Sequence, residues 1–272
     1  MFLGAVALAA CAAALVAPAL RSVGTPPAGE PAPRSRLAWA LVGAVAVLTL
    51  GVFPPAAVVV LLALRKLLPA GSLLARRGLP SVIGTRGLMS ASFFAAEAYI
   101  VFVLQEQWGL TPGIAGLALT AVGLTWAAAS QVQSRLGSRV SDVAVMRWGC
   151  ALLLVGTVAL ALAVRIHVPW ALAMAAYVVA GAGMGLGYPR TGVAMLAASS
   201  DSDRGFNSSA LSIADSLGGA LALSVSGVVF ATTKAAGIDP FASVYVLAAA
   251  VAVLAVVTAA RTGQPSGRRS TS

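Results

Sequence analysis

The sequence has very little charge for its length. Only 10% of its 272 residues are charged, whereas 59% are hydrophobic; about a quarter of residues are charged in ordinary soluble domains. Eighteen basic and eight acidic side chains are too few to form the polar shell that a soluble protein of this size needs. The shortage excludes an ordinary soluble globule and predicts a surface that faces lipid.

Cysteine and histidine are also scarce. Cys11 and Cys150 both lie within apolar runs, so a disulfide framework is not expected and both are predicted to be packing residues. His167 is the single histidine, which leaves no His/Cys set for a zinc site. The sequence therefore predicts no metal and no other cofactor.

The net charge of +10 would suggest a nucleic-acid partner if the basic residues formed one stripe with aromatic residues between them. They fall instead in short clusters between apolar runs, a pattern typical of membrane topology. No nucleic-acid partner is expected, and the predicted surroundings are the lipid bilayer.

Long apolar runs predict an all-α polytopic bundle of about nine spans, since about 20 helical residues cross the hydrocarbon core. The sequence predicts a span at 1–20, a linker region at 21–87 with two probable linking spans, a six-helix bundle at 88–260 and a disordered cytoplasmic tail at 261–272. Met1 opens directly in an apolar run without a basic segment before it, so we expect a span whose upstream partners are missing. The nine predicted spans are 1–20, 37–53, 54–68, 88–106, 112–134, 143–164, 168–190, 209–233 and 240–260.

The distribution of basic residues tests this topology, because basic residues gather in the inner loops of membrane proteins. With residue 1 outside, sixteen of the eighteen basic residues fall on the inner side, and Arg165 and Lys234 fall outside. The sequence therefore predicts a multi-pass protein of the plasma membrane, the inner membrane of the cell, with a cytoplasmic C-terminus.

Two acidic residues stand within predicted spans, where a carboxylate costs about 2.5–3.5 kcal/mol or more unless it is solvated or paired. Glu97 lies at the centre of 88–106 with no basic residue in the same span. Desolvation disfavours its ionised form, so it is expected either to exchange protons near neutral pH or to stay protonated in a hydrogen bond with a neighbouring helix. Asp215 lies nearer the inner boundary, where it either takes part in function or pairs with Arg190 or Arg204.

Small and polar residues predict how the helices meet. Asp215 and Gly219 share one helical face with Ser208, Ser212, Ala222 and Ser226, and that face is too polar for lipid. Thr120 and Gln131 in span 112–134, together with Ser212, are candidate cavity-lining residues. The glycine string of span 168–190 follows no strand, so close helix packing is a better interpretation than a phosphate loop. The predicted packing glycines are Gly181, Gly183, Gly185, Gly187 and Gly219.

The stretch 181–231, which begins GAGMGLGYPR, resembles the last inner loop and flanking helices of the major facilitator superfamily, in particular its fourteen-span drug:proton antiporter branch. Segment 88–134 is similar to the first two helices of that family's C-terminal half. The resemblance covers roughly 81–260, and 1–80 fits the preceding sixth span and two extra linking spans.

The family's inner-loop signature, Gly-x-x-x-Asp-Arg-x-Gly-x-Arg, falls on Ser130, Ser134, Arg135, Gly137 and Arg139. The resemblance implies a conformational latch here, and the basic half of the signature (Arg135, Gly137, Arg139) is present. Serine replaces both the glycine and the aspartate, so the basic half of the signature stands here without its carboxylate.

The resemblance implies a secondary transporter, present as a partial chain, that exports amphipathic small molecules in exchange for protons. Glu97 and Asp215 would lie on the proton or substrate path, and either a homodimer or a missing N-terminal half would supply the second bundle. A non-transporting membrane fragment or assembly subunit is the alternative. A membrane-embedded transferase is a remote alternative, because the sequence offers no His/Asp pair and no long loop for such chemistry, so no enzyme is predicted.

Overall fold

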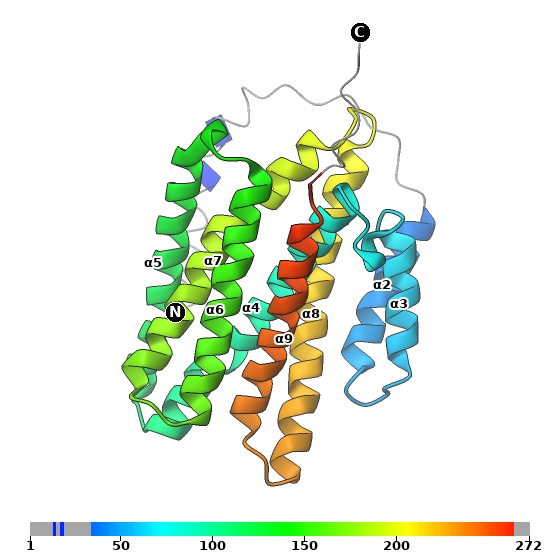
Figure 1. The fold of residues 1–272 in the computed structure, drawn as a ribbon. Coiled ribbons are helices and arrows are strands. Elements are labelled where there is room, and N and C mark those ends of the chain that lie inside the picture. Colours follow the sequence, from blue (N-terminus) through cyan, green and yellow to red (C-terminus); the bar gives the residue numbers. More distant parts are fainter. Residues whose placement is uncertain (1–12, 15–16, 19–33, 264–272) are drawn as a thin grey trace. The chain divides into compact units, whose positions relative to one another are not determined.

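The computed structural model describes residues 13–14, 17–18 and 34–263. Most of the predicted span at 1–20, including Cys11, therefore lies outside the described residues, as does the tail from residue 264. All regular secondary structure in the described residues is helical (Figure 1). The elements are α2 (Arg34–Thr49), α3 (Ala56–Leu67), η1 (Ser72–Leu74), α4 (Leu79–Trp108), α5 (Pro112–Leu136), η2 (Gly137–Arg139), α6 (Asp142–Arg165), α7 (Trp170–Ala197), α8 (Arg204–Ala235) and α9 (Pro240–Ala260).

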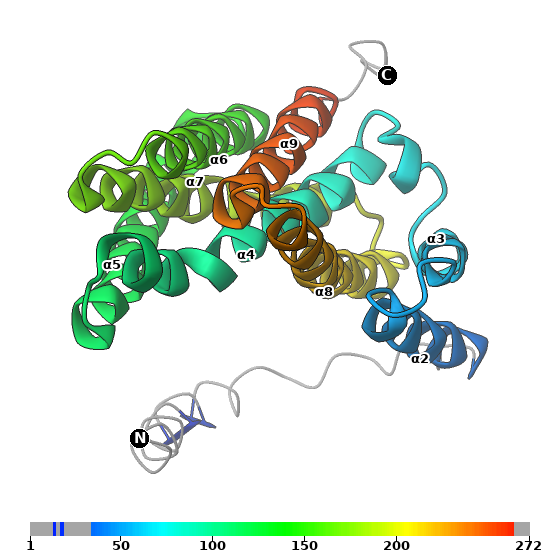
Figure 2. The same cartoon turned by 90° about the horizontal axis from the view of Figure 1, so that it is seen from below.

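The six helices α4 to α9 are long and apolar enough to cross a membrane. They contain between 21 and 32 residues, or about 32–48 Å of helix at 1.5 Å per residue, against about 30 Å of hydrocarbon. Seen from below, they form one bundle in which α4 runs between the α5–α6–α7 side and the α8–α9 side (Figure 2). The prediction of an all-α transmembrane bundle is confirmed.

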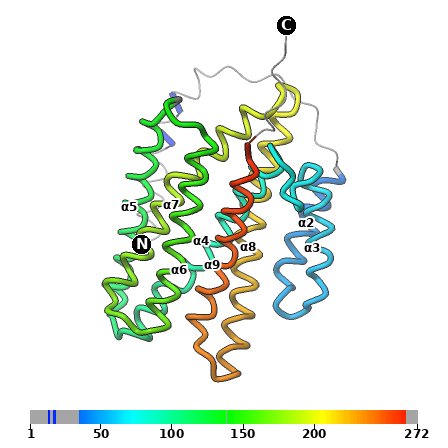
Figure 3. Tube along the Cα trace, in the orientation of Figure 1, coloured from blue at the N-terminus to red at the C-terminus, as the bar shows by residue number. Residues whose placement is uncertain are grey.

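Helices α2 and α3 form a hairpin beside α8, as the chain trace shows (Figure 3). They have 16 and 12 residues, so they reach only about 24 and 18 Å. Val47, Val60 and Leu67 bury an apolar seam that extends to Leu217 on α8. The two linking spans stay a prediction, because neither helix alone matches the thickness of the hydrocarbon core.

Helix α4 starts at Leu79, nine residues before the predicted span, and so includes Arg86, which falls within the predicted linker region 21–87. Pro80 stands in the first turn, where proline is tolerated. The Thr85 hydroxyl donates to the Ser81 carbonyl at 2.8 Å and so stays satisfied within the helix. Arg86 does not end the helix, because a carboxylate on another helix compensates its charge.

Helix α7 runs through Pro189 to Ala197, seven residues beyond the end of the predicted span 168–190. Proline has no N–H to donate to the carbonyl four residues earlier, which is that of Gly185. The Ser130 hydroxyl of α5 donates to this carbonyl at 3.1 Å. A side chain from the neighbouring helix thus satisfies the freed backbone oxygen, as is required within a membrane.

The glycines of α7 face two neighbours. A Cβ on Gly183 would collide with the backbone of α6 at Leu153 and Gly149, whereas a Cβ on Gly185 would collide with Trp126 of α5. Residues two apart on a helix point in nearly opposite directions. The glycines of α7 therefore alternate between contacts with α5 and contacts with α6. Gly181 also faces α5 through Val122, Gly187 faces α6 and Met89 of α4, and Gly219 of α8 faces Phe94 of α4.

The α4–α8 crossing has a close contact that the sequence analysis missed. A Cβ on Gly218 would overlap the carbonyl of Gly87, and a Cβ on Gly87 would lie 2.8 Å from the carbonyl oxygen of Ala214. The two backbones meet at this pair of small residues, beside Asp215. The crossing therefore brings α8's carboxylate within reach of α4.

Candidate functional site

Asp215 of α8 is held by three side chains from α4 and α7. The Tyr188 hydroxyl donates to Oδ2 at 2.7 Å, and Arg86 Nε donates to Oδ1 at 3.2 Å. The Ser90 hydroxyl also donates to Oδ1. The Arg86 and Asp215 side chains are 17% and 23% exposed, so the pair is largely desolvated and each charge depends on the other.

Arg86 is held on its other side by α7. Its guanidinium lies 3.3 Å from the centroid of the Tyr188 ring, a cation–π arrangement. Its Nη1 donates to the Tyr188 carbonyl at 3.2 Å and to the Thr191 hydroxyl at 3.1 Å. We call Arg86, Ser90, Tyr188, Thr191 and Asp215 the Asp215 cluster. It ties together α4, α7 and α8 through charged and polar groups.

Asp215 pairs with neither Arg190 nor Arg204, the two partners given as one alternative to a functional role. Arg190 Nη1 contacts Asp142 at 2.7 Å, and Arg204 contacts Asp201 at 2.8 Å on the exposed surface. Arg86 is the nearer cation because the glycine contact between α4 and α8 brings it to Asp215. Both arginines that the sequence offered as partners face other loops.

Arg190 is buried and connects α7 to the α5–α6 loop through hydrogen bonds. It is not an arginine whose head group is solvated at the membrane interface. It is 7% exposed, and its guanidinium donates to Asp142 and to the carbonyls of Gln133 and Gly137. Gly137 has a φ of +51°, a conformation that favours glycine. Arg135 and Arg139, the other members of the signature, are exposed and make no ion pair with residues in the described part of the chain.

Glu97 lies half-buried on α4 and has no hydrogen-bond or ion-pair partner among residues 34–263. Phe93, one turn earlier on α4, packs against Tyr177 of α7. The hydroxyls of Tyr177 and of Tyr245 on α9 are buried and likewise unpartnered within the described residues. Two buried hydroxyls and one half-buried carboxyl group, from three helices, thus lack hydrogen-bond partners among the described residues.

A row of aromatic rings connects the region of Glu97 with the Asp215 cluster. Phe93 stacks on Tyr177 with ring centroids 5.9 Å apart and meets Trp126 of α5 edge-on at 5.3 Å. Trp126 meets Tyr188 at 5.6 Å, also edge-on. Phe93 and Glu97 are four residues apart on α4 and therefore share a face. We call Phe93, Phe94, Trp126, Tyr177 and Tyr188 the aromatic row.

The three candidate cavity residues are not joined to this group. Thr120, Gln131 and Ser212 are all exposed. Gln131 accepts a hydrogen bond at its backbone oxygen from Ser134 at 2.8 Å, one turn along its own helix. The structure brings Glu97 and Asp215 to the two ends of the aromatic row and leaves these three residues on open surfaces of α5 and α8.

Arg86, Ser90 and the role of Tyr188 were not predicted from the sequence, although α4 carries a signal for the first two. Arg86, Ser90, Phe93 and Glu97 recur at spacings of four, three and four, and therefore share one helical face. This pattern was hidden because Arg86 was assigned to the linker region 21–87 instead of the span. For Tyr188 no comparable signal exists, because its partners lie on other helices.

Comparisons with known proteins agree with this architecture. The family model described as Major Facilitator Superfamily matches residues 82–271. A search of curated protein sequences finds no match. The crystal structure of a fucose:proton symporter of E. coli has a similar fold, with a TM-score of 0.53 and 18% sequence identity, and the match covers 77% of this chain and 53% of the symporter chain. The chain thus spans about half the length of that symporter. Since the family model covers well over half of its residues, the chain belongs to the Major Facilitator Superfamily and is a multi-pass membrane protein.

Proposed function

We propose that α4 to α9 form the C-terminal half of a secondary transporter that moves a small molecule in exchange for protons. Transporters of this superfamily are built from two six-helix halves with a substrate site near the midplane, and they alternate access by rocking one half against the other. The observation that carries the proposal is the aromatic row, which links a half-buried, unpartnered Glu97 to the Asp215 cluster. Both carboxylates thereby border one continuous row of rings, in which Phe93 and Tyr177 are buried and Phe94, Trp126 and Tyr188 are partly exposed.

Glu97 is the proposed proton carrier. A carboxylate without a cation or hydrogen-bond donor in its surroundings gains more from protonation than one already paired. Asp215 already has Arg86, Tyr188 and Ser90, so it is proposed to hold α4, α7 and α8 in register. Protonation of Glu97 would neutralise the site and release the substrate outward, and deprotonation toward the cytoplasm would reset it.

The proposed substrate class is amphipathic and cationic, as in the drug:proton antiporter branch that 181–231 resembles. Flat apolar groups can stack on aromatic rings, and cations are attracted to ring faces and to a nearby carboxylate. The partly exposed rings of the aromatic row (Phe94, Trp126 and Tyr188) and the half-buried Glu97 are proposed to supply both features. The proposed location is the plasma membrane, with the C-terminus in the cytoplasm.

The test is transport of a fluorescent amphipathic cation by inverted membrane vesicles with an imposed pH gradient. Glu97→Gln is expected to abolish pH-driven uptake while membrane insertion stays normal. Glu106→Gln is the matched control on the same helix, because Glu106 is exposed at the end of α4, and it is expected to retain uptake. Wild-type rates in Glu97→Gln would exclude Glu97 as the proton carrier.

The second six-helix half is proposed to come from a missing N-terminal half in the same polypeptide or from a second copy of the chain. An antibody against 261–272 would measure the mass of the native polypeptide in membranes of the source cell. A band nearly twice the 27.1 kDa of this chain would indicate one long polypeptide, and a band at 27.1 kDa would require a homodimer or partner. Absence of transport in either form would favour the alternative of an assembly subunit.

A further inference from the structure

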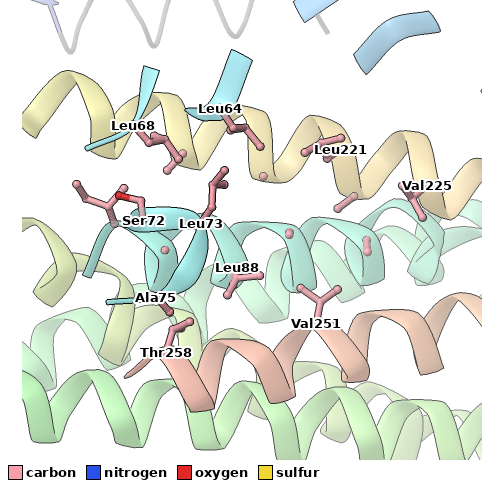
Figure 4. A pocket seen from close by; sticks show the side chains of 18 of the residues that line it. Leu64, Leu68, Ser72, Leu73, Ala75, Leu88, Leu221, Val225, Val251 and Thr258 are labelled. Carbon is pink, nitrogen blue, oxygen red and sulfur yellow. The ribbon is translucent and has the colours of Figure 1, made fainter. Parts of the chain in front are cut away.

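A long apolar groove lies apart from the aromatic row, between the linker hairpin and the bundle. It is a cavity of about 400 Å³ lined by α3, the segment around η1, α4, α8 and α9. Figure 4 shows side chains from these elements around it, with Leu88 of α4 and Val251 of α9 on one side and Leu221 of α8 on another. The groove includes Gly87, Ala214 and Gly218 of the α4–α8 crossing, and its lining contains no residue of the aromatic row or the Asp215 cluster.

The groove extends along α4 from Ile83 to Ala95. The twelve residue steps between them correspond to about 18 Å of helix, close to the depth of about 15 Å for one leaflet of the hydrocarbon core. Its lining is leucine, valine, isoleucine, alanine and glycine, with Ser72 and Thr258 as the two polar side chains. The length and the lining suit one acyl chain from one leaflet.

The groove has a basic mouth. A second cavity, of about 500 Å³, shares Leu64, Leu68, Ser72 and Leu73 with the groove and is also lined by Arg65 and Arg76. Both arginines are exposed, and neither forms an ion pair with the described residues. Two free cations therefore stand where the apolar groove opens.

Ser72 lies where the groove and its mouth meet. Its side chain is buried, with 6% of the residue exposed, and its hydroxyl has no hydrogen-bond partner within residues 34–263. The other polar lining residue, Thr258, is satisfied by Ala255 and Thr85. A buried hydroxyl without a partner is uncommon, because it loses its bond to water. It is available to donate to a bound molecule.

We infer that this groove binds one anionic phospholipid of the inner leaflet. One acyl chain lies between α4, α8 and α9, the phosphate lies at Arg65 and Arg76, and the Ser72 hydroxyl donates to a head-group or ester oxygen. A neutral apolar ligand would use the groove but leave both arginines and the hydroxyl unused. The lipid would join the linker hairpin to the bundle, which are otherwise in contact mainly through α2, α3 and α8.

The test is native mass spectrometry of the full-length protein, released from detergent micelles and titrated with dioleoyl phosphatidylglycerol or dioleoyl phosphatidylcholine. The expected result is one phosphatidylglycerol per chain, bound at least about fivefold more tightly than phosphatidylcholine, since each basic residue near an anionic lipid contributes roughly fivefold. Arg76→Gln should weaken phosphatidylglycerol binding about fivefold. Arg77→Gln, which removes a neighbouring exposed arginine outside both cavities, should leave it unchanged.

A second pair of variants tests the apolar part. Val251→Trp fills the groove and should remove the bound lipid, whereas Val253→Trp places the same side chain on an exposed face of the same helix and should keep it. Circular dichroism confirms that all variants are folded. Equal affinity for the two lipids, or equal effects of Arg76→Gln and Arg77→Gln, would overturn the inference. Loss of a dimer in Val251→Trp alone would assign the groove to a second copy of the chain. Displacement of the lipid by a transported cation would assign it to the substrate. Either result would also overturn the inference.

Discussion

Arg86→Gln tests whether the Asp215 cluster holds α4, α7 and α8 together. The substitution leaves the Asp215 carboxylate with two hydroxyl donors, Tyr188 and Ser90, and no cation. The opposite change, Asp215→Asn, leaves Arg86 on the Tyr188 ring with two oxygen acceptors. Arg86 thus keeps more partners in Asp215→Asn than Asp215 keeps in Arg86→Gln. Arg86→Gln is therefore expected to lower the free energy of unfolding more.

The size of the effect follows from burial. Removing one partner of a fully buried ion pair lowers the free energy of unfolding by about 3–5 kcal/mol. Because these side chains remain 17% and 23% exposed and the carboxylate keeps two donors, we expect about 2 kcal/mol for Arg86→Gln. For Asp215→Asn we expect about 1 kcal/mol. The double variant should lose about 2 kcal/mol, which leaves a coupling energy of about 1 kcal/mol.

The assay is equilibrium unfolding in mixed micelles titrated with sodium dodecyl sulfate, followed by far-ultraviolet circular dichroism. The matched control is Arg204→Gln, whose partner Asp201 is 90% exposed, and an exposed pair contributes at most about 1 kcal/mol. The measured losses at low and high salt should differ little for the Arg86 variant, because buried pairs are weakly screened. Equal losses in the Arg86 and Arg204 variants, or additive effects of the two cluster substitutions, would refute the reasoning.

Three further predictions concern packing and loop anchoring. Gly183→Val should lower the free energy of unfolding by about 3 kcal/mol in the same titration, because its side chain would meet the backbone of α6, whereas Gly192→Val, which points into open space, should change it little. Arg190→Gln should speed tryptic cleavage between α5 and α6 in micelles, and a rate equal to that of Gly192→Val would contradict the proposed anchoring role. In a Cys11→Ser background, Cys150, which is fully buried, should react with a maleimide only after denaturation; labelling of the native protein would place it at an accessible surface.

The features of this fold that could be predicted are those that depend on the composition and the length of the apolar runs. Apolar runs of about 20 residues must form helices in lipid, since no other local structure satisfies the backbone there. The six helices α4 to α9 follow from this requirement. Their ends were less predictable, because Arg86 and Pro189 look like helix boundaries until partners on other helices are known.

The sequence also pointed to the two acidic residues of interest, since a carboxylate within a membrane span is costly wherever it lies. The sequence could not show that the two carboxylates differ in their ion-pair and hydrogen-bond partners. Asp215 has a cation and two hydroxyl donors, whereas Glu97 has neither among the described residues. That difference depends on where α4 crosses α8, which the contact of Gly87 with Gly218 sets.

The sequence alone therefore determined that this protein is helical, how many helices form the bundle, and that the carboxylates within them must be compensated. Each of these features depends only on one segment of the chain and on the solvent around it. The tertiary structure decided the partners. It assigned Arg86 to Asp215, Arg190 to the α5–α6 loop and Ser130 to the carbonyl freed by Pro189. Each pair joins residues of different helices, and helix crossings depend on shape complementarity between faces that no single segment contains.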